Sequence, residues 1–296
     1  MIIVVVGPTG SGKSALAMRL ARHLGGQIVN GDAFQVYQEL NIGTAKPSYE
    51  TREKIPHHLY DFVSPSIDYN VKNYQQDLRA VLDDLLIKKK PIILVGGTGL
   101  YIKAGLYDYV FEDEPVVDLS DLEKLTNQEL YDYLKTIDVV EAEKLHPNNR
   151  KRVLRAIAIY RSAGANKTSL VAKQKHKCLY DVTFIGLDTD RLKLYASINT
   201  RVNRMFAAGL IDEVRDLVTK YGKKHHAFLA IGYKEVIQHL DGKLSFGDAV
   251  EAIQKNSRNY AKRQFTFFRH QLPIEWYPDG DTAYQAILKK LGENHG

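Results

Sequence analysis

The apolar residues near the start of the chain fall into short runs separated by segments that favour helices. Ile2–Val6 and Ile92–Val95 are fully apolar runs, and Gln27–Asn30 is predicted as a further strand. Lys13–Leu24 is predicted as a helix, and Tyr74–Lys88 repeats its leucines with a helical period. Unbroken apolar strands that alternate with helices are typical of a parallel sheet covered on both faces. We therefore predict an α/β core.

After Tyr107 the pattern changes to consecutive helical segments, and a strand pattern returns at Val182–Leu187. We expect residues 119–177 to form a mainly helical insertion domain, and residues 1–118 and 178–296 to form the core. The expected helices of this half are Gln128–Lys135, Asp138–Leu145, Arg150–Arg161, Arg191–Ala207, Ile211–Lys220, Tyr233–Leu240 and Phe246–Arg269.

A glycine-rich segment follows the first strand directly and matches the pattern G-x-x-x-x-G-K-[ST]. A strand, such a loop and a helix together build a phosphate cradle from backbone N–H groups and a helix N-terminus. Lys13 would add a positive charge, and the Ser14 hydroxyl would bind Mg²⁺. This predicts a P-loop NTPase-like core, without saying which phosphate is bound. The residues expected to hold phosphate are Gly7, Pro8, Thr9, Gly10, Ser11, Gly12, Lys13 and Ser14.

Two further candidates follow strands of the same predicted sheet. Ligands bind parallel sheets at the carboxyl ends of the strands, so Asp32 and Thr98 are expected to face the phosphate loop. Asp32 suits a general base or a water-mediated Mg²⁺ ligand, or it serves as a turn residue. Thr98 suits a hydroxyl donor near a leaving oxygen, or a tight turn. The strand before Thr98 does not end in a carboxylate, which argues against motor ATPases and switch GTPases and leaves small-molecule kinases open.

Charge is distributed unevenly along a chain of net charge +6. Residues 107–143 hold twelve acidic residues against Lys124 and Lys135, whereas residues 150–177 hold nine lysines and arginines and no acid. Residues 255–270 form a second basic stretch without acids. Basic stretches with interleaved aromatic residues suit a polyanion such as RNA, and the alternative is a solvated helix face.

The remaining composition narrows the class of protein. A single cysteine, Cys178, excludes an internal disulfide and fits a reducing cytoplasm. We find no signal peptide and no apolar stretch of about 20 residues, so we expect a cytoplasmic protein without a membrane span. Arg201 and Arg204 lie three apart on a predicted helix and suit a diphosphate, or they belong to a solvated surface face. The paired histidines lack further ligands at useful spacing, so Mg²⁺ at Ser14 is the one metal we expect.

Blocks of sequence along nearly the whole chain resemble the bacterial tRNA dimethylallyltransferases, also called tRNA isopentenyltransferases. The resemblance lies in the phosphate loop and in the blocks 32–37 (DAFQVY), 41–47 (NIGTAKP), 56–59 (PHHL), 95–101 (VGGTGLY), 145–148 (LHPN), 205–210 (MFAAGL), 230–234 (AIGYK) and 261–264 (AKRQ).

This resemblance implies substrates that composition alone does not identify. The loop would hold the diphosphate of dimethylallyl diphosphate, and the acceptor would be the N6 amine of the adenosine 3′-adjacent to the anticodon in tRNA. The resemblance makes Asp32 the general base, Thr98 a residue near the bridging oxygen and Arg201 a diphosphate ligand. It also implies contact with the anticodon stem-loop, and separately we expect a monomer. The implied tRNA contacts are Asp32, Ala33, Phe34, Gln35, Thr98, Lys151, Arg152, Val153, Leu154 and Arg155.

Three alternatives remain open from the sequence. A P-loop small-molecule kinase would share the loop, and an adenylate isopentenyltransferase would act on free nucleotide and would not need the basic insertion. An RNA-binding module whose loop senses nucleotide would perform no chemistry.

Overall fold

The structure is a computed structural model of the chain, and it describes residues 1–111, 117–164, 166, 168–169 and 175–293. The chain forms two compact units, Met1–Leu106 with Leu179–Gly296 and, separately, Tyr107–Cys178. An isolated antiparallel bridge joins Tyr107 to Cys178, so the second unit begins earlier in the chain than residue 119. Five charged residues of the biased stretches lie outside the described residues: Glu112, Asp113, Glu114, Lys167 and Lys173.

The first unit is built on a six-stranded sheet, counted over the described residues, in which all neighbouring strands pair in parallel. Its order is β3-β2-β4-β1-β5-β6, which confirms the predicted fold class. The strands are β1 (Ile2–Val6), β2 (Gln27–Asn30), β3 (His57–His58), β4 (Ile92–Gly96), β5 (Val182–Leu187) and β6 (Glu275–Tyr277). Val6 of β1 is in register with Gly96 and Gly186, so β1 and β4 end at one level and β5 continues for one more residue.

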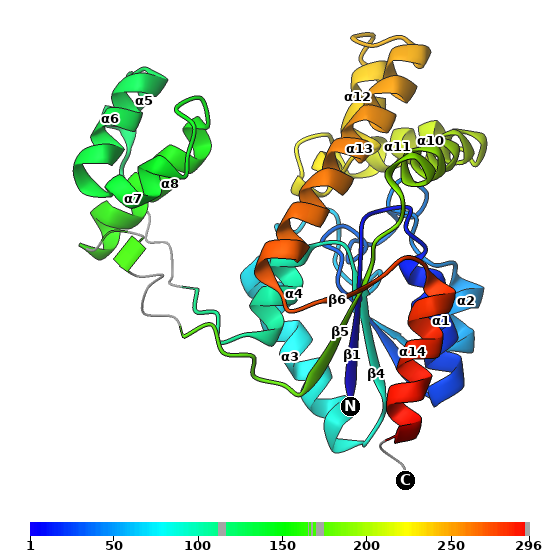
Figure 1. Cartoon of the computed structure of the whole chain (residues 1–296). Helices are drawn as coiled ribbons and strands as arrows, with labels where there is room; N and C mark the ends of the chain where they lie inside the picture. The colour runs from blue at the N-terminus through cyan, green and yellow to red at the C-terminus, as the bar shows by residue number, and fades with distance from the viewer. Residues whose placement is uncertain (112–116, 165, 167, 170–174, 294–296) are drawn as a thin grey trace. The chain divides into compact units, whose positions relative to one another are not determined.

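Helices cover both faces of the sheet (Figure 1). On one face lie α1 (Lys13–Leu24) and α14 (Gly280–Glu293), and on the other α3 (Val71–Ile87) and α4 (Gly99–Leu106). Leu16 and Leu20 of α1 are buried with Ile3, Val5 and Ile287 in one core cluster. Every side chain of β1 is buried, as a strand packed on both faces requires.

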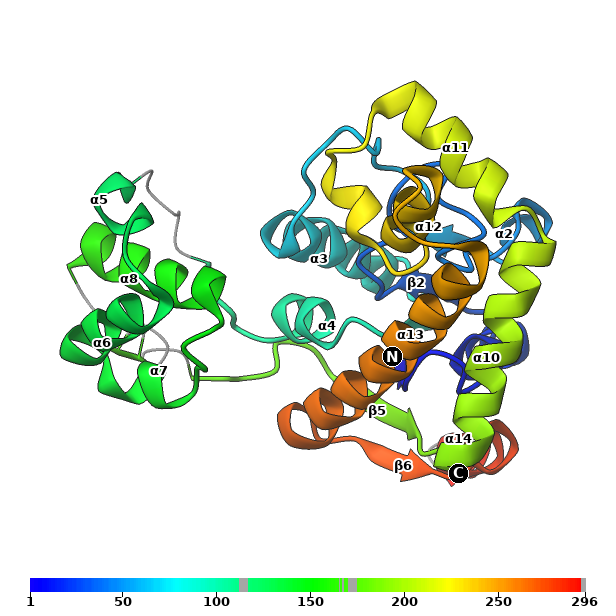
Figure 2. The same cartoon turned by 90° about the horizontal axis from the view of Figure 1, so that it is seen from above.

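The remaining helices of this unit gather at the carboxyl ends of the strands (Figures 1 and 2). Among them, α10 packs against α13, and α12 packs against both α11 and α13. The site described below therefore lies between the strand ends and these helices. Their bounds, with those of the short helix beside β3, are α2 (Tyr49–Lys54), α10 (Arg191–Ala207), α11 (Leu210–Tyr221), η1 (His226–Leu229), α12 (Tyr233–Leu240) and α13 (Phe246–Gln271).

The second unit packs short helices around a small apolar core of its own. The helices are α5 (Ser120–Glu123), α6 (Asn127–Ile137), α7 (Val139–Glu143) and α8 (Arg150–Ala163). Leu130, Leu134, Val153 and Ile157 are fully buried in this core. The Arg150 guanidinium donates to backbone carbonyls at the end of α5, including that of Leu125 at 2.6 Å, and this satisfies groups that the helix cannot pair itself.

Across the part of the chain that the structure describes, no helix is both apolar enough and long enough for a bilayer.

Candidate functional site

The phosphate loop lies between the end of β1 and the start of α1, as its sequence predicts. Gly10 and Gly12 have φ angles of 84° and 88°, a region that side chains rarely enter, so these positions favour glycine. The Ser11 hydroxyl is buried without a hydrogen-bond partner among the described residues. That hydroxyl lies near Gly7 and faces neither of the cavities described below, so the fit to phosphate rests on the backbone of Gly10 and Gly12, which lines a cavity at the N-terminus of α1. The loop therefore fits an anionic phosphate group.

Lys13, at the N-terminus of α1, is the cation of this loop. Its Nζ lies 3.4 Å from the Pro8 carbonyl oxygen. Burial and then the Arg201 guanidinium lower the pKa of Lys13 to about 8, whereas the Asp32 carboxylate acts in the opposite direction. An enclosed ammonium beside a guanidinium is a strong attractor for a multiply charged anion.

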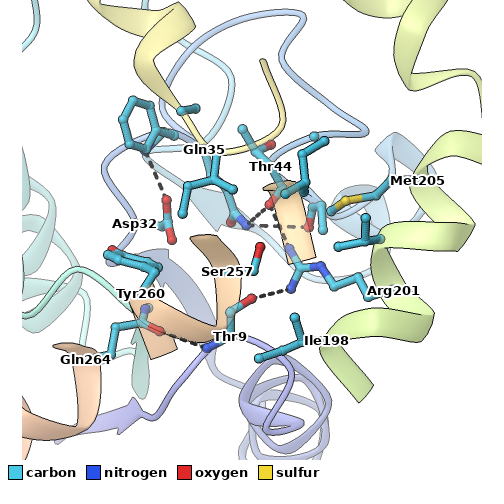
Figure 3. A pocket seen from close by; sticks show the side chains of 18 of the residues that line it. Thr9, Asp32, Gln35, Thr44, Ile198, Arg201, Met205, Ser257, Tyr260 and Gln264 are labelled. Atoms are coloured by element: carbon cyan, nitrogen blue, oxygen red, sulfur yellow. Dashed lines mark hydrogen bonds between the residues drawn. The ribbon is translucent and has the colours of Figure 1, made fainter. Parts of the chain in front are cut away.

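Asp32 and Thr98 meet where β2 and β4 end. The Thr98 hydroxyl accepts a hydrogen bond from the Ala33 N–H at 3.0 Å, and the Asp32 carboxylate accepts one from the Phe34 N–H at 3.0 Å. The buried Asn30 amide accepts from the Asp32 N–H at 2.9 Å and so fixes the turn. These bonds leave the second carboxylate oxygen of Asp32 available to the cavity, where its side chain points in Figure 3.

A close backbone approach makes this geometry possible. A Cβ atom at Gly96 would lie 2.1 Å from the carbonyl carbon of Gly31, so this end of β4 cannot carry a side chain. The Thr98 N–H then donates to the Gly31 carbonyl at 3.1 Å. The ends of β2 and β4 therefore bring Asp32 and Thr98 close together.

Arg201 reaches the phosphate loop from α10. Its Nη1 donates to Thr9 Oγ1 at 2.8 Å, and its Nη2 lies 3.4 Å from the Thr44 carbonyl oxygen (Figure 3). Burial lowers the pKa of Arg201, and the Asp32 carboxylate opposes this shift. The predicted neighbour Arg204 is exposed and lines the open side of the loop.

Two residues of α13 belong to the site, although the sequence patterns assigned them no role. Gln264 is buried; its Oε1 accepts from the Thr9 N–H at 2.9 Å, and its Nε2 donates to the Gly97 carbonyl at 2.8 Å. Gln264 thus links the phosphate loop to the turn before Thr98. Burial, with the Asp32 charge second, raises the pKa of Tyr260 to about 12, so its hydroxyl stays protonated. Gln264 stands in one of the quoted sequence blocks, but nothing local to it indicates its distant partners.

Two cavities meet at Lys13, Ser14 and Arg201. One has a volume of about 290 Å³ and contains Asp32, the loop residue Thr9 and an apolar wall (Figure 3). Its apolar wall includes Ile198, Val202, Met205, Leu229, Ile231 and Ile253. The other, of about 480 Å³, opens over Gly10 and Gly12. A polar, cationic mouth therefore continues into a chamber that is apolar on one side and carries a carboxylate on the other.

The predicted tRNA-contacting residues divide between the two compact units. Asp32, Phe34 and Gln35 line the cavity of the first unit, and Ala33 is fixed by Thr98. In the second unit, Lys151, Arg152 and Arg155 are exposed on α8. Val153 is fully buried in the core of that unit, and Leu154 packs against the same core.

The histidine pairs make bonds within the fold. His57 Nδ1 lies 2.6 Å from the Ile55 carbonyl oxygen, and His58 Nε2 lies 2.6 Å from Gln27 Oε1. Among the described residues, no three histidines, cysteines or carboxylates gather in a way that would hold a metal ion.

Comparison with known proteins identifies the family. A family model described as IPP transferase matches residues 35–271. The chain belongs to the IPP transferase family. It is 46% identical over 293 residues to a tRNA dimethylallyltransferase of Anoxybacillus flavithermus, covering 98% of this chain and 94% of that protein. It is 40% identical to the corresponding protein of Staphylococcus haemolyticus, covering 98% and 90%.

Solved structures of IPP transferases share this fold. A tRNA delta(2)-isopentenylpyrophosphate transferase of Staphylococcus epidermidis superposes with a TM-score of 0.74 at 36% identity, covering 99% of both chains. A eukaryotic dimethylallyltransferase acting on tRNA superposes with a TM-score of 0.83 at 27% identity, covering 99% of this chain and 79% of that one. The resemblance stated from the sequence blocks is therefore confirmed.

Proposed function

We propose that this chain transfers a dimethylallyl group from dimethylallyl diphosphate to the N6 amine of the adenosine 3′-adjacent to the anticodon in tRNA, and releases diphosphate. The observation that carries this proposal is a single cavity that holds a phosphate loop with Arg201 at one side, Asp32 at another and an apolar wall between. Membership of the IPP transferase family, and relatives named tRNA dimethylallyltransferase, support the pair of substrates.

The diphosphate would bind at the cationic side of the cavity. The loop glycines Gly10 and Gly12 line this side together with Lys13 and Arg201. As the allylic C–O bond breaks, its electron pair stays on the diphosphate, and these groups stabilise the developing charge. The groups are already ordered before the reaction, because Gln264 and Arg201 both bind Thr9.

The acceptor amine would meet Asp32. An adenine amine is a poor nucleophile because its lone pair is delocalised into the ring, so its proton must leave as the C–N bond forms. The carboxylate oxygen of Asp32 that faces the cavity takes this proton. The Thr98 hydroxyl accepts from the Ala33 N–H and is also hydrogen-bonded to the Tyr260 hydroxyl, so it would exchange the bond with Tyr260 for one to the bridging oxygen.

Magnesium suits this site at Ser14. The exposed Ser14 lines both cavities beside Lys13. Proteins commonly hold Mg²⁺ with one or two of their own oxygens together with substrate phosphates. When bound, the ion would add positive charge at the diphosphate.

The exposed cations of α8, Lys151, Arg152 and Arg155, would contact the backbone of the anticodon stem-loop. The target base must leave its stack to reach Asp32, at a cost of a few kcal/mol. Phosphate contacts can offset that cost, because they release counterions from the RNA. Val153 and Leu154 would contribute by holding the helix against its own core.

The decisive experiment offers the protein labelled dimethylallyl diphosphate, unmodified tRNA and AMP together. We expect label in tRNA, on the adenosine beside the anticodon. Label in AMP would instead favour an adenylate isopentenyltransferase. No label in tRNA, combined with consumption of ATP in a parallel reaction with candidate small molecules, would replace the proposal with a kinase.

A further inference from the structure

A carboxylate outside the cavity holds the loop of residues 41–44 (the 41–44 loop). Glu213 of α11 accepts hydrogen bonds from the backbone N–H groups of Asn41 at 3.2 Å, Ile42 at 2.8 Å and Gly43 at 3.3 Å. The Tyr233 hydroxyl donates to the same carboxylate at 2.5 Å. Three successive amide groups that converge in this way form an anion-binding concavity, and here a side chain of the protein fills it.

The 41–44 loop needs such an anchor. Ala45, which follows it, has a φ of 50°, a strained conformation for a residue with a side chain. Gly43 packs against the Tyr233 ring so closely that a Cβ atom would lie 2.4 Å from a ring carbon. Strained segments persist only where their surroundings hold them, and the Glu213 carboxylate supplies several of the bonds that do so.

The 41–44 loop ends at the carbonyl that binds Arg201. Thr44 O accepts from Gln35 Nε2 at 2.9 Å and lies 3.4 Å from Arg201 Nη2. Arg201 therefore has one partner on the phosphate loop, Thr9, and one on the 41–44 loop. The position of the second partner depends on Glu213, which lines neither of the two cavities.

We propose that Glu213 is a positioning residue for diphosphate binding, acting through the 41–44 loop and the Thr44 carbonyl on the guanidinium of Arg201. Its importance for catalysis rests on the proposed function, whereas its effect on the binding of inorganic pyrophosphate does not. Glutamine at this position would offer one acceptor oxygen and turn an NH₂ group toward backbone donors, which breaks the arrangement without changing the size of the side chain.

The first measurement is the affinity of E213Q for inorganic pyrophosphate by calorimetry. We expect it to weaken about tenfold, with a matching rise in KM for dimethylallyl diphosphate and unchanged affinity for tRNA. E39Q is the matched control. The exposed Glu39 also joins this part of the chain to α11, through Lys220 at 2.7 Å and Tyr221 at 2.8 Å, but has no contact with the 41–44 loop amides among the hydrogen bonds of the described residues. Wild-type pyrophosphate affinity in E213Q would overturn the proposal.

A double-mutant cycle separates positioning from a general loss of structure. If Glu213 acts through Arg201, E213Q should weaken pyrophosphate binding far less in an R201K background than in the wild type. Equal weakening in both backgrounds would overturn the proposal. If E213Q does not fold, E213D takes its place in the same cycle, because the shorter carboxylate keeps the charge but not the reach. If the wild type does not label tRNA but the double-mutant cycle gives the expected result, the proposed function is wrong and this role of Glu213 in pyrophosphate binding still holds.

Discussion

Arg201 Nη1 donates a 2.8 Å hydrogen bond to Thr9 Oγ1, and this bond ties α10 to the phosphate loop across 192 positions of sequence. Gln264 binds the N–H of the same Thr9 from α13. The phosphate loop is therefore braced from two helices that lie far from it in sequence. Because the cations are held in place before substrate arrives, stabilisation of the leaving diphosphate requires little reorganisation.

R201K tests whether the planar guanidinium with its two donor nitrogens is needed, or only its positive charge. Lysine keeps the charge but cannot bind Thr9 and Thr44 O together, so we expect kcat to fall about 100-fold. Affinity for tRNA should change little, as measured by filter binding. A kcat within a few-fold of the wild-type value would mean that charge alone, without geometry, suffices at this position.

D32N tests the proton acceptor. The amide preserves the shape of the side chain and can still accept the Phe34 N–H bond, but it cannot take a proton from the adenine amine. We expect transfer to fall by about 10²–10⁴-fold, with tRNA and pyrophosphate affinities near those of the wild type. Single-turnover labelling of tRNA measures the chemical step, and an unchanged rate there would remove Asp32 from this role.

The pKa of Lys13 predicts a pH dependence. Because this pKa is lowered to about 8, the ammonium loses its charge as the pH of the unliganded protein rises through that value. Pyrophosphate affinity should therefore fall above about pH 8. K13R is the control, because arginine stays charged and leaves only the titration of pyrophosphate itself. Parallel profiles for the two proteins would contradict the prediction.

The same shift has a consequence for stability. The unfolded chain keeps this proton up to the ordinary pKa of 10.5, so it binds more protons than the folded chain between pH 8 and pH 10.5. The charge of the partly buried Lys13 therefore lowers the free energy of unfolding most below pH 8, and this cost is relieved as the pH rises.

The parts of the fold predicted from sequence are those with strong local patterns. The strands predicted at Ile2–Val6 and Ile92–Val95, the glycine-rich loop and the long helices each carry a strong local pattern of apolar residues or glycines. The edge strands β3 and β6 were not predicted, because two or three residues are too few to show an alternation. The bond between Gln264 and Thr9 spans 255 positions, and no local pattern indicates it.

Counting charges along the sequence overestimates how many lysines and arginines of the two basic stretches lack a partner in the fold. Arg258 of the second basic stretch donates to Asn199 at 2.7 Å, and Arg269 binds Asp188 at 2.8 Å. Arg161 of the first stretch binds Asp121 through two nitrogens, at 2.8 and 2.7 Å. An acid distant in sequence can lie beside a cation in the fold, so an acid-free stretch is not necessarily a free basic surface.

Substitution of exposed cations on α8 tests the proposed RNA surface. K151A and R152A should each weaken tRNA binding, and each lost phosphate contact should reduce the slope of log affinity against log salt by about 1. K135A on α6 is the control in the same unit, because Lys135 lies over the Tyr131 ring and near Asp132. Salt slopes equal to that of the wild type in both α8 variants would place the RNA surface elsewhere.

The apolar wall of the cavity predicts that the prenyl chain and the diphosphate of the substrate are bound by different residues. Ile198, Val202 and Met205 follow one another at helical spacing along α10 and face the cavity, with Arg201 on the same helix beside the phosphate loop. If this wall holds the five-carbon chain, M205A removes apolar contact from that chain but leaves the diphosphate contacts. KM for dimethylallyl diphosphate should rise about tenfold, within the range for lost apolar groups in a binding pocket. Affinity for inorganic pyrophosphate should stay at the wild-type value, because pyrophosphate has no prenyl chain. An equal weakening of both ligands would show that Met205 supports the site as a whole, and that the prenyl group lies against another surface.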